Sequence, residues 1–101
     1  MISQIKPSFT KNNTLKISIS SDILNNKYKV CFSLVYSIKE IKGAVIINQI
    51  GRYYELEVLN ELIFIKLQTP KTGTYNLSCG PEGLFLINKE NKLVECSIDN
   101  L

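Results

Sequence analysis

Apolar residues recur at every second position along most of this chain, and this period constrains its fold more than any other feature. The clearest run covers residues 28–37, where the large apolar side chains alternate with their neighbours: Tyr28, Val30, Phe32, Leu34 and Tyr36. Successive side chains of a β-strand point to opposite faces of a sheet, so this period is typical of a strand with one face in a core. The run predicts a central strand over residues 28–37.

The same period predicts further short strands. They cover residues 15–19, 44–49, 53–59, 62–68, 75–79, 84–88 and 92–98. Gly51 can adopt a positive φ, so we expect it to join the second and third of these in a hairpin. Residues 21–26, rich in Asp and Asn, predict a loop with room for one helical turn. Residues 69–73 predict another loop, and residues 80–83 predict a turn around Pro81.

About eight short strands, with turns roughly every 8 to 12 residues, are typical of a β-sandwich or a small barrel. We expect an all-β fold, an immunoglobulin-like antiparallel β-sandwich of about seven to eight strands. The chain has no Trp, so this is a prediction of architecture and not of membership in the antibody family. A length of 101 residues suits one core rather than two, which predicts a single domain over residues 1–101.

The residue types exclude several kinds of active site. There is no His, so Ser-His-Asp and Cys-His arrangements cannot be assembled. Three Cys without a CxxC pair, and no His beside them, argue against a metal site. Cys79 and Cys96 alternate with apolar residues, which favours buried thiols over a disulfide. We therefore expect no catalytic residues, no metal, no cofactor and no enzyme activity from this chain.

One pair of carboxylates has a spacing that glycosidases use. Glu55 and Glu57 share one face of the predicted strand, about 7 Å apart by strand rise. An acid catalyst also needs a deep cleft that raises its pKa. Carboxylates on the solvent face of a strand are the simpler interpretation.

Charge gives little sign of a nucleic-acid partner. The net charge of +3 comes from 12 basic and 9 acidic residues, and the lysines stand singly along the chain. Arg52 is the sole arginine, so recognition of phosphate or base edges by paired hydrogen bonds is not expected. Apolar runs fall short of the ~20 residues that span a bilayer and of a signal peptide's core. We expect no membrane partner and a cytoplasmic location.

Two sets of residues are candidates for binding. Arg52, Tyr53 and Tyr36 would supply an aromatic surface with a charged neighbour, on which a sugar can stack; tyrosines that fill the rim of the core are the alternative. A second set is apolar on strand faces that should meet water, and would form an interface with another domain or another copy if its members converge. Its members are Cys31, Val35, Leu62 and Phe64.

Residues 43–56, GAVIINQIGRYYEL, resemble a segment in the N-terminal β-sandwich of bacterial β-N-acetylhexosaminidases, glycoside hydrolase family 20. In that family a glycine-initiated strand leads through a turn into an aromatic-rich strand that ends in Glu-Leu. Residues 32–37, FSLVYS, look like the preceding strand, and the likeness covers about residues 28–100. The chain departs from the family at Tyr54, where His is frequent, and at residues 60–64, where the family has a turn with Pro and Trp.

The family's catalytic Asp-Glu pair lies in a separate (β/α)8 barrel, for which 101 residues leave no room, so no catalytic residue can be carried over. The resemblance implies a non-catalytic accessory domain that packs on a partner domain. A stand-alone carbohydrate-binding module and a structural or oligomerisation module are the alternatives. The expected partners are accordingly a neighbouring catalytic domain, a second copy or a carbohydrate.

Overall fold

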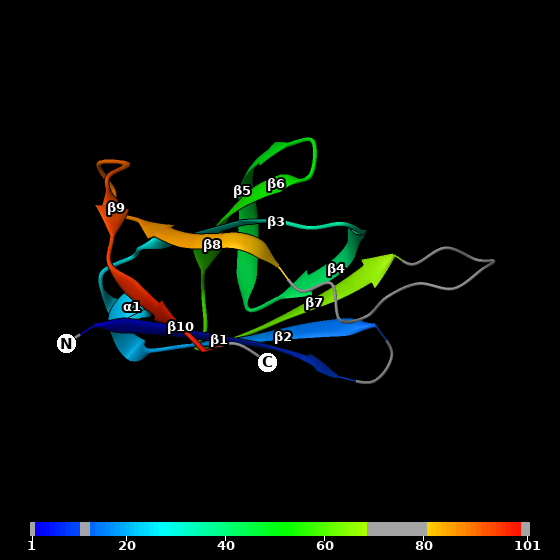
Figure 1. Cartoon of the computed structure of the whole chain (residues 1–101), viewed down its shortest axis with the longest axis horizontal. Helices are drawn as coiled ribbons and strands as arrows, with labels where there is room; N and C mark the ends of the chain where they lie inside the picture. Colours follow the sequence, from blue (N-terminus) through cyan, green and yellow to red (C-terminus); the bar gives the residue numbers. More distant parts are fainter. Residues whose placement is uncertain (1, 11–12, 69–80, 100–101) are drawn as a thin grey trace.

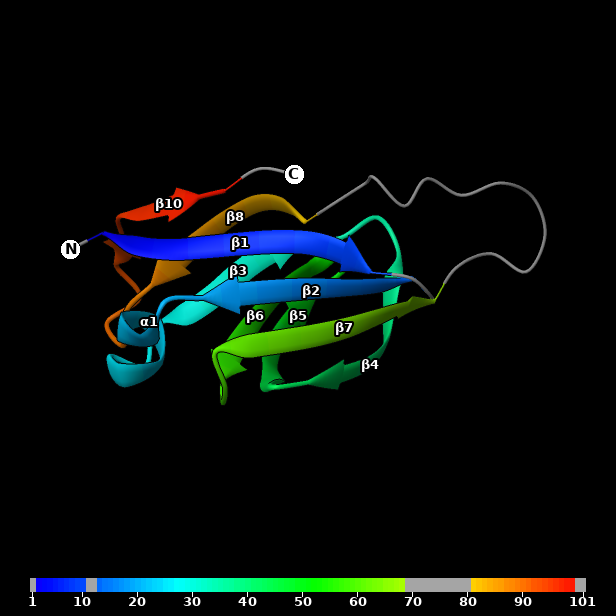
Figure 2. The ribbon, with the colours of Figure 1, turned by 90° about the horizontal axis from the view of Figure 1, so that it is seen from below.

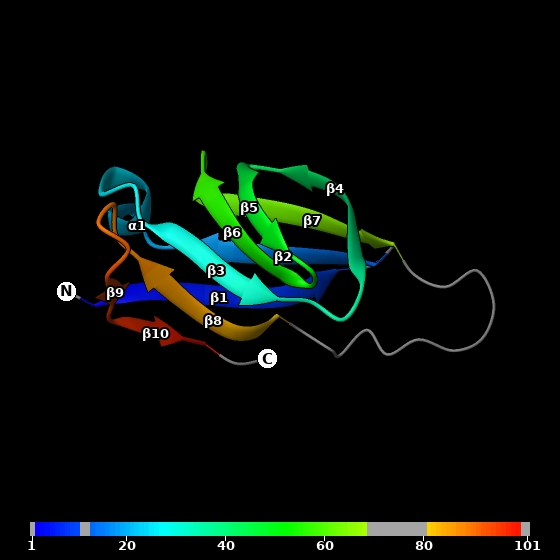
Figure 3. The same ribbon diagram turned by 90° about the horizontal axis from the view of Figure 1, so that it is seen from above.

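The computed structural model describes residues 2–10, 13–68 and 81–99, which form two five-stranded sheets packed face to face (Figure 1). Sheet A has the order β10-β1-β2-β7-β4 and sheet B the order β5-β6-β3-β8-β9. Figure 2 shows sheet A in front, and Figure 3 shows sheet B in front. The predicted all-β sandwich is confirmed, with ten strands among the described residues.

The bounds of the strands show how the chain alternates between the sheets. Sheet A contains β1 (Ser3–Thr10), β2 (Thr14–Ile19), β4 (Ser37–Lys42), β7 (Leu62–Gln68) and β10 (Cys96–Ile98). Sheet B contains β3 (Lys29–Ser33), β5 (Ala44–Ile50), β6 (Tyr53–Val58), β8 (Glu82–Ile87) and β9 (Leu93–Val94). A single helical turn, α1 (Ser21–Asn25), links β2 to β3. The strand pairs are antiparallel except β1 with β10, which is parallel.

The core lies between the sheets, and the alternation of the sequence fills it. In β7 every second residue is buried, as the predicted strand over residues 62–68 requires, and Ile63 pairs with Ile17 of β2. Sheet B contributes Phe32 and Tyr54, whose rings lie 6.2 Å apart between centroids. Ile23 of α1 is fully buried and closes one end of the core. Each sheet therefore has one face in the core and one outer face.

The first strand was not predicted, because Pro7 interrupts it. Ser20 N donates to Gln4 O at 2.9 Å on the β2 side, and Asp99 N donates to Ile5 O at 2.9 Å on the opposite side. Backbone groups alternate between the two sides of a strand, so the nitrogen of Pro7 faces away from β2. Among the described residues the pairing of β10 with β1 ends at Ile5, so in this part of the chain Pro7 lies where that side of β1 is an edge.

The single strand predicted over residues 28–37 is wrong. β3 ends at Ser33 in sheet B, and β4 begins at Ser37 in sheet A, so residues 34–36 cross between the sheets. Leu34 is buried and Tyr36 packs against the core. The period of two continues through the crossing because the connecting segment also turns alternate side chains inward.

The other predicted boundaries have mixed outcomes. The strand expected over 92–98 is divided in the same way, into β9 and β10. The hairpin of β5 and β6 is confirmed, with Gly51 at a φ of +59°. β8 begins at residue 82 rather than 84. The loop predicted over residues 69–73 and the strand over 75–79 lie outside the described residues, as do Cys79 and Gly80.

Candidate binding site on the outer face of sheet B

Four neighbouring strands of sheet B, β5, β6, β3 and β8, bring chemically distinctive side chains to the outer face. Val30 and Phe32 point into the core, so Cys31 between them points outward, and the register places it opposite Glu55 of β6 and Phe85 of β8. Tyr53 stands two residues before Glu55 and shares its face. We call the group of Cys31, Asn48, Tyr53, Glu55 and Phe85 the aromatic face.

Tyr53 and Phe85 form the apolar part of the aromatic face. Their ring centroids lie 6.2 Å apart and their planes differ by 13°, although β6 and β8 are separated by β3. Both residues are partly exposed. The two rings therefore offer a near-parallel aromatic pair to a ligand that approaches this side of the sandwich.

Glu55 supplies the polar part. Its Oε2 accepts a hydrogen bond from the Tyr53 hydroxyl at 2.7 Å, and its Oε1 accepts one from Asn48 Nδ2 at 3.2 Å. These two donors, the Tyr53 hydroxyl first, hold the pKa of the Glu55 carboxyl below its ordinary value. Burial, and then the neighbouring Glu55, raises the pKa of Tyr53. At neutral pH the pair is consequently a carboxylate and a neutral phenol.

This electrostatic arrangement suits binding better than acid catalysis. A general acid of a glycosidase needs a raised pKa, whereas that of Glu55 is lowered. Glu57, the second carboxylate of the pair, is exposed and lies opposite Lys29 in the register of β3 and β6. The two glutamates thus match the interpretation of carboxylates on an outer strand face.

Cys31 lies beneath the aromatic pair. It is 0% exposed, so the expectation that it forms part of an exposed patch is wrong: neighbouring outer-face side chains cover it. Burial raises the pKa of the Cys31 thiol, which keeps it protonated and unreactive at neutral pH. Cys31 and Cys96 are both free thiols.

The structure keeps two of the three predicted ligand residues together and places the third elsewhere. Tyr53 lies in the aromatic face, and Arg52 is exposed beside it in the turn between β5 and β6. Tyr36 instead packs against the core, as the alternative interpretation of a tyrosine at the core rim had it. Phe85 was missed, because the apolar run Leu84, Phe85, Leu86, Ile87 has no alternation that would reveal which side chain points outward.

The structure also does not bring the four predicted interface residues together. Leu62 and Phe64 are exposed on the outer face of sheet A, on the opposite side of the molecule from Cys31, and Val35 lies in the crossing between β3 and β4. Lys16 and Lys42 are the cross-strand neighbours of Phe64. A shallow hollow of about 370 Å³ adjoins this ring, lined by Thr14, Glu40, Lys42, Phe64 and Lys66.

Over residues 2–10, 13–68 and 81–99, no group of three or more His, Cys, Asp or Glu side chains is arranged to hold a metal ion. Within the same described part of the chain, no helix is long and apolar enough to cross a membrane. Comparisons with protein-family models, with curated proteins and with solved structures find no match to this chain. The resemblance to the hexosaminidase module therefore stays a prediction.

Proposed function

We propose that this chain is a non-catalytic β-sandwich domain that binds a carbohydrate on the aromatic face of sheet B. The observation that carries the proposal is the near-parallel pair of Tyr53 and Phe85 beside the ionised carboxylate of Glu55. A pyranose ring has an apolar C–H face that packs on aromatic rings, and hydroxyls at its rim that donate to carboxylates. The aromatic face offers both kinds of group side by side, because Tyr53 and Glu55 are successive residues on the outer face of β6.

The polar groups around the rings are arranged for hydroxyl recognition. Glu55 keeps acceptor capacity beyond its bonds to Tyr53 and Asn48, because an ionised carboxylate has about four lone-pair sites. The amide of Asn48 and the guanidinium of Arg52 are exposed donors on the adjoining strand and turn. A neutral or acetylated sugar would satisfy these groups without burying an unpaired charge.

Isothermal titration with chitin oligosaccharides tests the proposal. The native chain should bind, and Tyr53→Ala and Phe85→Ala should each weaken binding about fivefold, since a stacked ring contributes about 1 kcal/mol. Phe64→Ala is the matched control, because it removes an exposed ring from the opposite sheet and should leave binding unchanged. Absence of binding heat from the native chain, or equal weakening by Phe64→Ala, would contradict the proposal.

A second candidate function rests on a different observation. Leu62 and Phe64 are exposed side by side on the outer face of sheet A, and their removal from water would favour packing against another domain. This is the accessory role that the resemblance to the hexosaminidase module implies. NMR spectra of the labelled chain, recorded with a separately produced (β/α)8 domain of a family 20 enzyme, should shift the signals of Leu62 and Phe64. Unchanged spectra would count against this role.

A further inference from the structure

The described residues form two sheets with four edge strands, and these differ in how they are protected against pairing with another chain. β9 and β10 have two and three residues, which makes them poor templates. β4 carries Lys39, Glu40 and Lys42, and charged side chains discourage pairing at an edge. β5 has seven residues, Ala44–Ile50, with no charge and no proline. It is therefore the edge that invites another strand.

The side chains of β5 add to this exposure. Val45, Ile47 and Ile50 are 47, 44 and 68% exposed. The hairpin of β5 and β6 rises away from sheet A, so the half of β5 next to the turn lies well away from β4, the edge strand of sheet A on this side of the sandwich (Figure 1). A partner strand could reach this half without displacing a neighbour that the described residues provide.

A bulge limits which part of β5 is free to pair. The register with β6 shifts between Ile46 and Asn48, so Ile47 is an extra residue and the strand bends there. Residues 48–50 form the regular segment beyond the bulge. Ile50 and Tyr53 flank a two-residue turn, so their backbone groups hydrogen-bond to each other. Because backbone groups alternate sides along a strand, the N–H and C=O of Gln49 point away from β6, to the unpaired side of β5.

We infer that residues 48–50 of β5 pair antiparallel with the same residues of a second copy of this chain, about a twofold axis at Gln49. The axis places Gln49 opposite its own copy and Ile50 opposite Asn48, so no charges are brought together. The same pairing of β4 about an axis at Lys39 would oppose lysine to lysine. The two five-stranded sheets B would become one sheet of ten strands (5 + 5), and the twofold symmetry closes the assembly at a dimer.

The short pairing segment predicts a weak dimer, because so small an interface falls below the area of stable complexes. Sedimentation velocity should show monomer at about 10 μM and a growing dimer fraction towards about 1 mM. Ile50→Lys should weaken association at least tenfold, because the lysines of the two copies would be diagonal cross-strand neighbours on one face, roughly 7–8 Å apart. Leu93→Lys is the matched control: Leu93 is 77% exposed on β9, and this substitution should not change association.

Hydrogen exchange of the native chain gives a second test that needs no variant. The amide of Gln49 should exchange more slowly at high than at low concentration, whereas amides of β4 should not change. A native chain that remains monomeric at about 1 mM would overturn the inference. So would open-ended aggregation, equal weakening by Leu93→Lys, or a concentration effect confined to other strands. Sugar binding on the aromatic face is tested independently of the dimer, because titration with chitin oligosaccharides measures it at concentrations where the chain is monomeric.

Discussion

Tyr53 and Phe85 belong to strands that are not neighbours, yet their rings lie almost parallel across the buried Cys31 thiol. Phe85→Ala should open this cover and lower the free energy of unfolding by about 1–3 kcal/mol, because a half-buried ring is lost. Cys31 should then react with a thiol reagent in the folded state, whereas in the native chain it should react only on unfolding. Phe85→Leu, which keeps the apolar bulk, should preserve most of the protection. Rapid labelling of Cys31 in the native chain would contradict the prediction that the two rings shield this thiol.

Asp22 makes folding sensitive to acid. Its Oδ2 accepts a hydrogen bond from the buried Ser3 hydroxyl, which ties α1 to the start of β1. The hydroxyls of Ser20 and Ser3, in that order, lower the pKa of Asp22 from 3.8. A lowered pKa in the folded state means that the stabilisation is present above the unfolded pKa and is lost as pH falls through the folded one.

Urea unfolding at about pH 7, 4 and 3 should therefore show a falling stability for the native chain, and a shallower fall for Asp22→Asn. Part of the fall should remain in this variant, because the pKa of Glu55 is lowered as well. Glu90→Gln, at an exposed position, is the control and should follow the native curve. Parallel curves for the native chain and Asp22→Asn would refute the role assigned to Asp22.

Gly43 and Gly51 both have positive φ, but they should respond differently to substitution. A Cβ on Gly43, at a φ of +86°, would lie 2.2 Å from Leu62 O, so backbone must move to admit it. A Cβ on Gly51, at +59°, meets open space. Gly43→Ala should therefore cost about 3 kcal/mol or more, and Gly51→Ala about 1 kcal/mol, measured by chemical denaturation. Similar losses for both variants would show that the contact with Leu62 is not the determining factor.

The sequence predicts the strands whose two faces differ, and fails where a segment serves both sheets. β7 and the hairpin of β5 and β6 follow from alternation and one glycine, because each stays within one sheet. The crossing at residues 34–36 keeps the same alternation while the chain changes sheets, so the period cannot mark the end of β3. β1 was not predicted, because a strand can contain Pro7 only where β10 does not pair with it. Where β10 ends is set by the tertiary structure and not by the local sequence.

The candidate site was predicted in part for the same reason. Tyr53 and Arg52 lie on a hairpin whose faces alternation defines, and both are near the aromatic face. Phe85 lies in an apolar run without alternation, and its approach to Tyr53 requires β3 to lie between β6 and β8. The order of strands in a sheet arises from long-range packing, so a local pattern holds no information about which aromatic residues meet across it.

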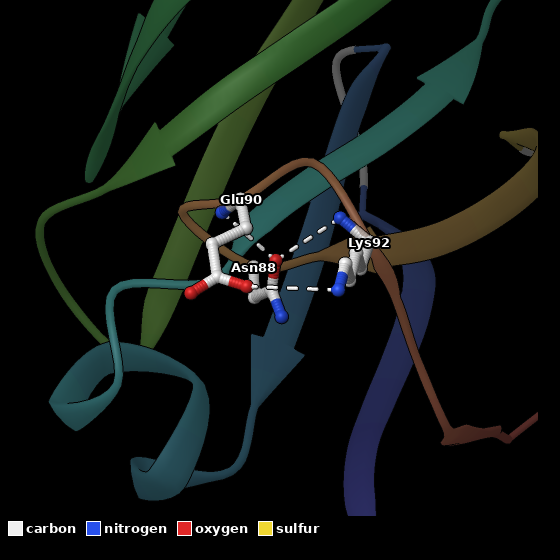
Figure 4. Close-up of polar contacts among 3 residues, drawn as sticks. All are labelled: Asn88, Glu90 and Lys92. Carbon is white, nitrogen blue, oxygen red and sulfur yellow. Dashed lines mark hydrogen bonds and ion pairs between the residues drawn. The ribbon is translucent and has the colours of Figure 1, made fainter.

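The turn between β8 and β9 contains two kinds of polar contact, hydrogen bonds to the Asn88 side chain and an exposed ion pair (Figure 4). We expect only the hydrogen bonds to stabilise the fold. Asn88 Oδ1 accepts from the backbone nitrogens of Glu90 at 2.9 Å and of Lys92 at 3.0 Å. The charged groups of Glu90 and Lys92 lie 4.0 Å apart, with side chains 75 and 76% exposed.

Asn88→Ala should lower the free energy of unfolding by about 1–2 kcal/mol, because two backbone donors lose their acceptor. Glu90→Ala should cost less than about 0.5 kcal/mol, since an exposed pair is screened by water. Asn88→Asp retains an acceptor oxygen, so its loss of stability in thermal unfolding should lie between those of Asn88→Ala and Glu90→Ala. A loss for Glu90→Ala as large as that for Asn88→Ala would show that the ion pair, and not the amide, organises this turn.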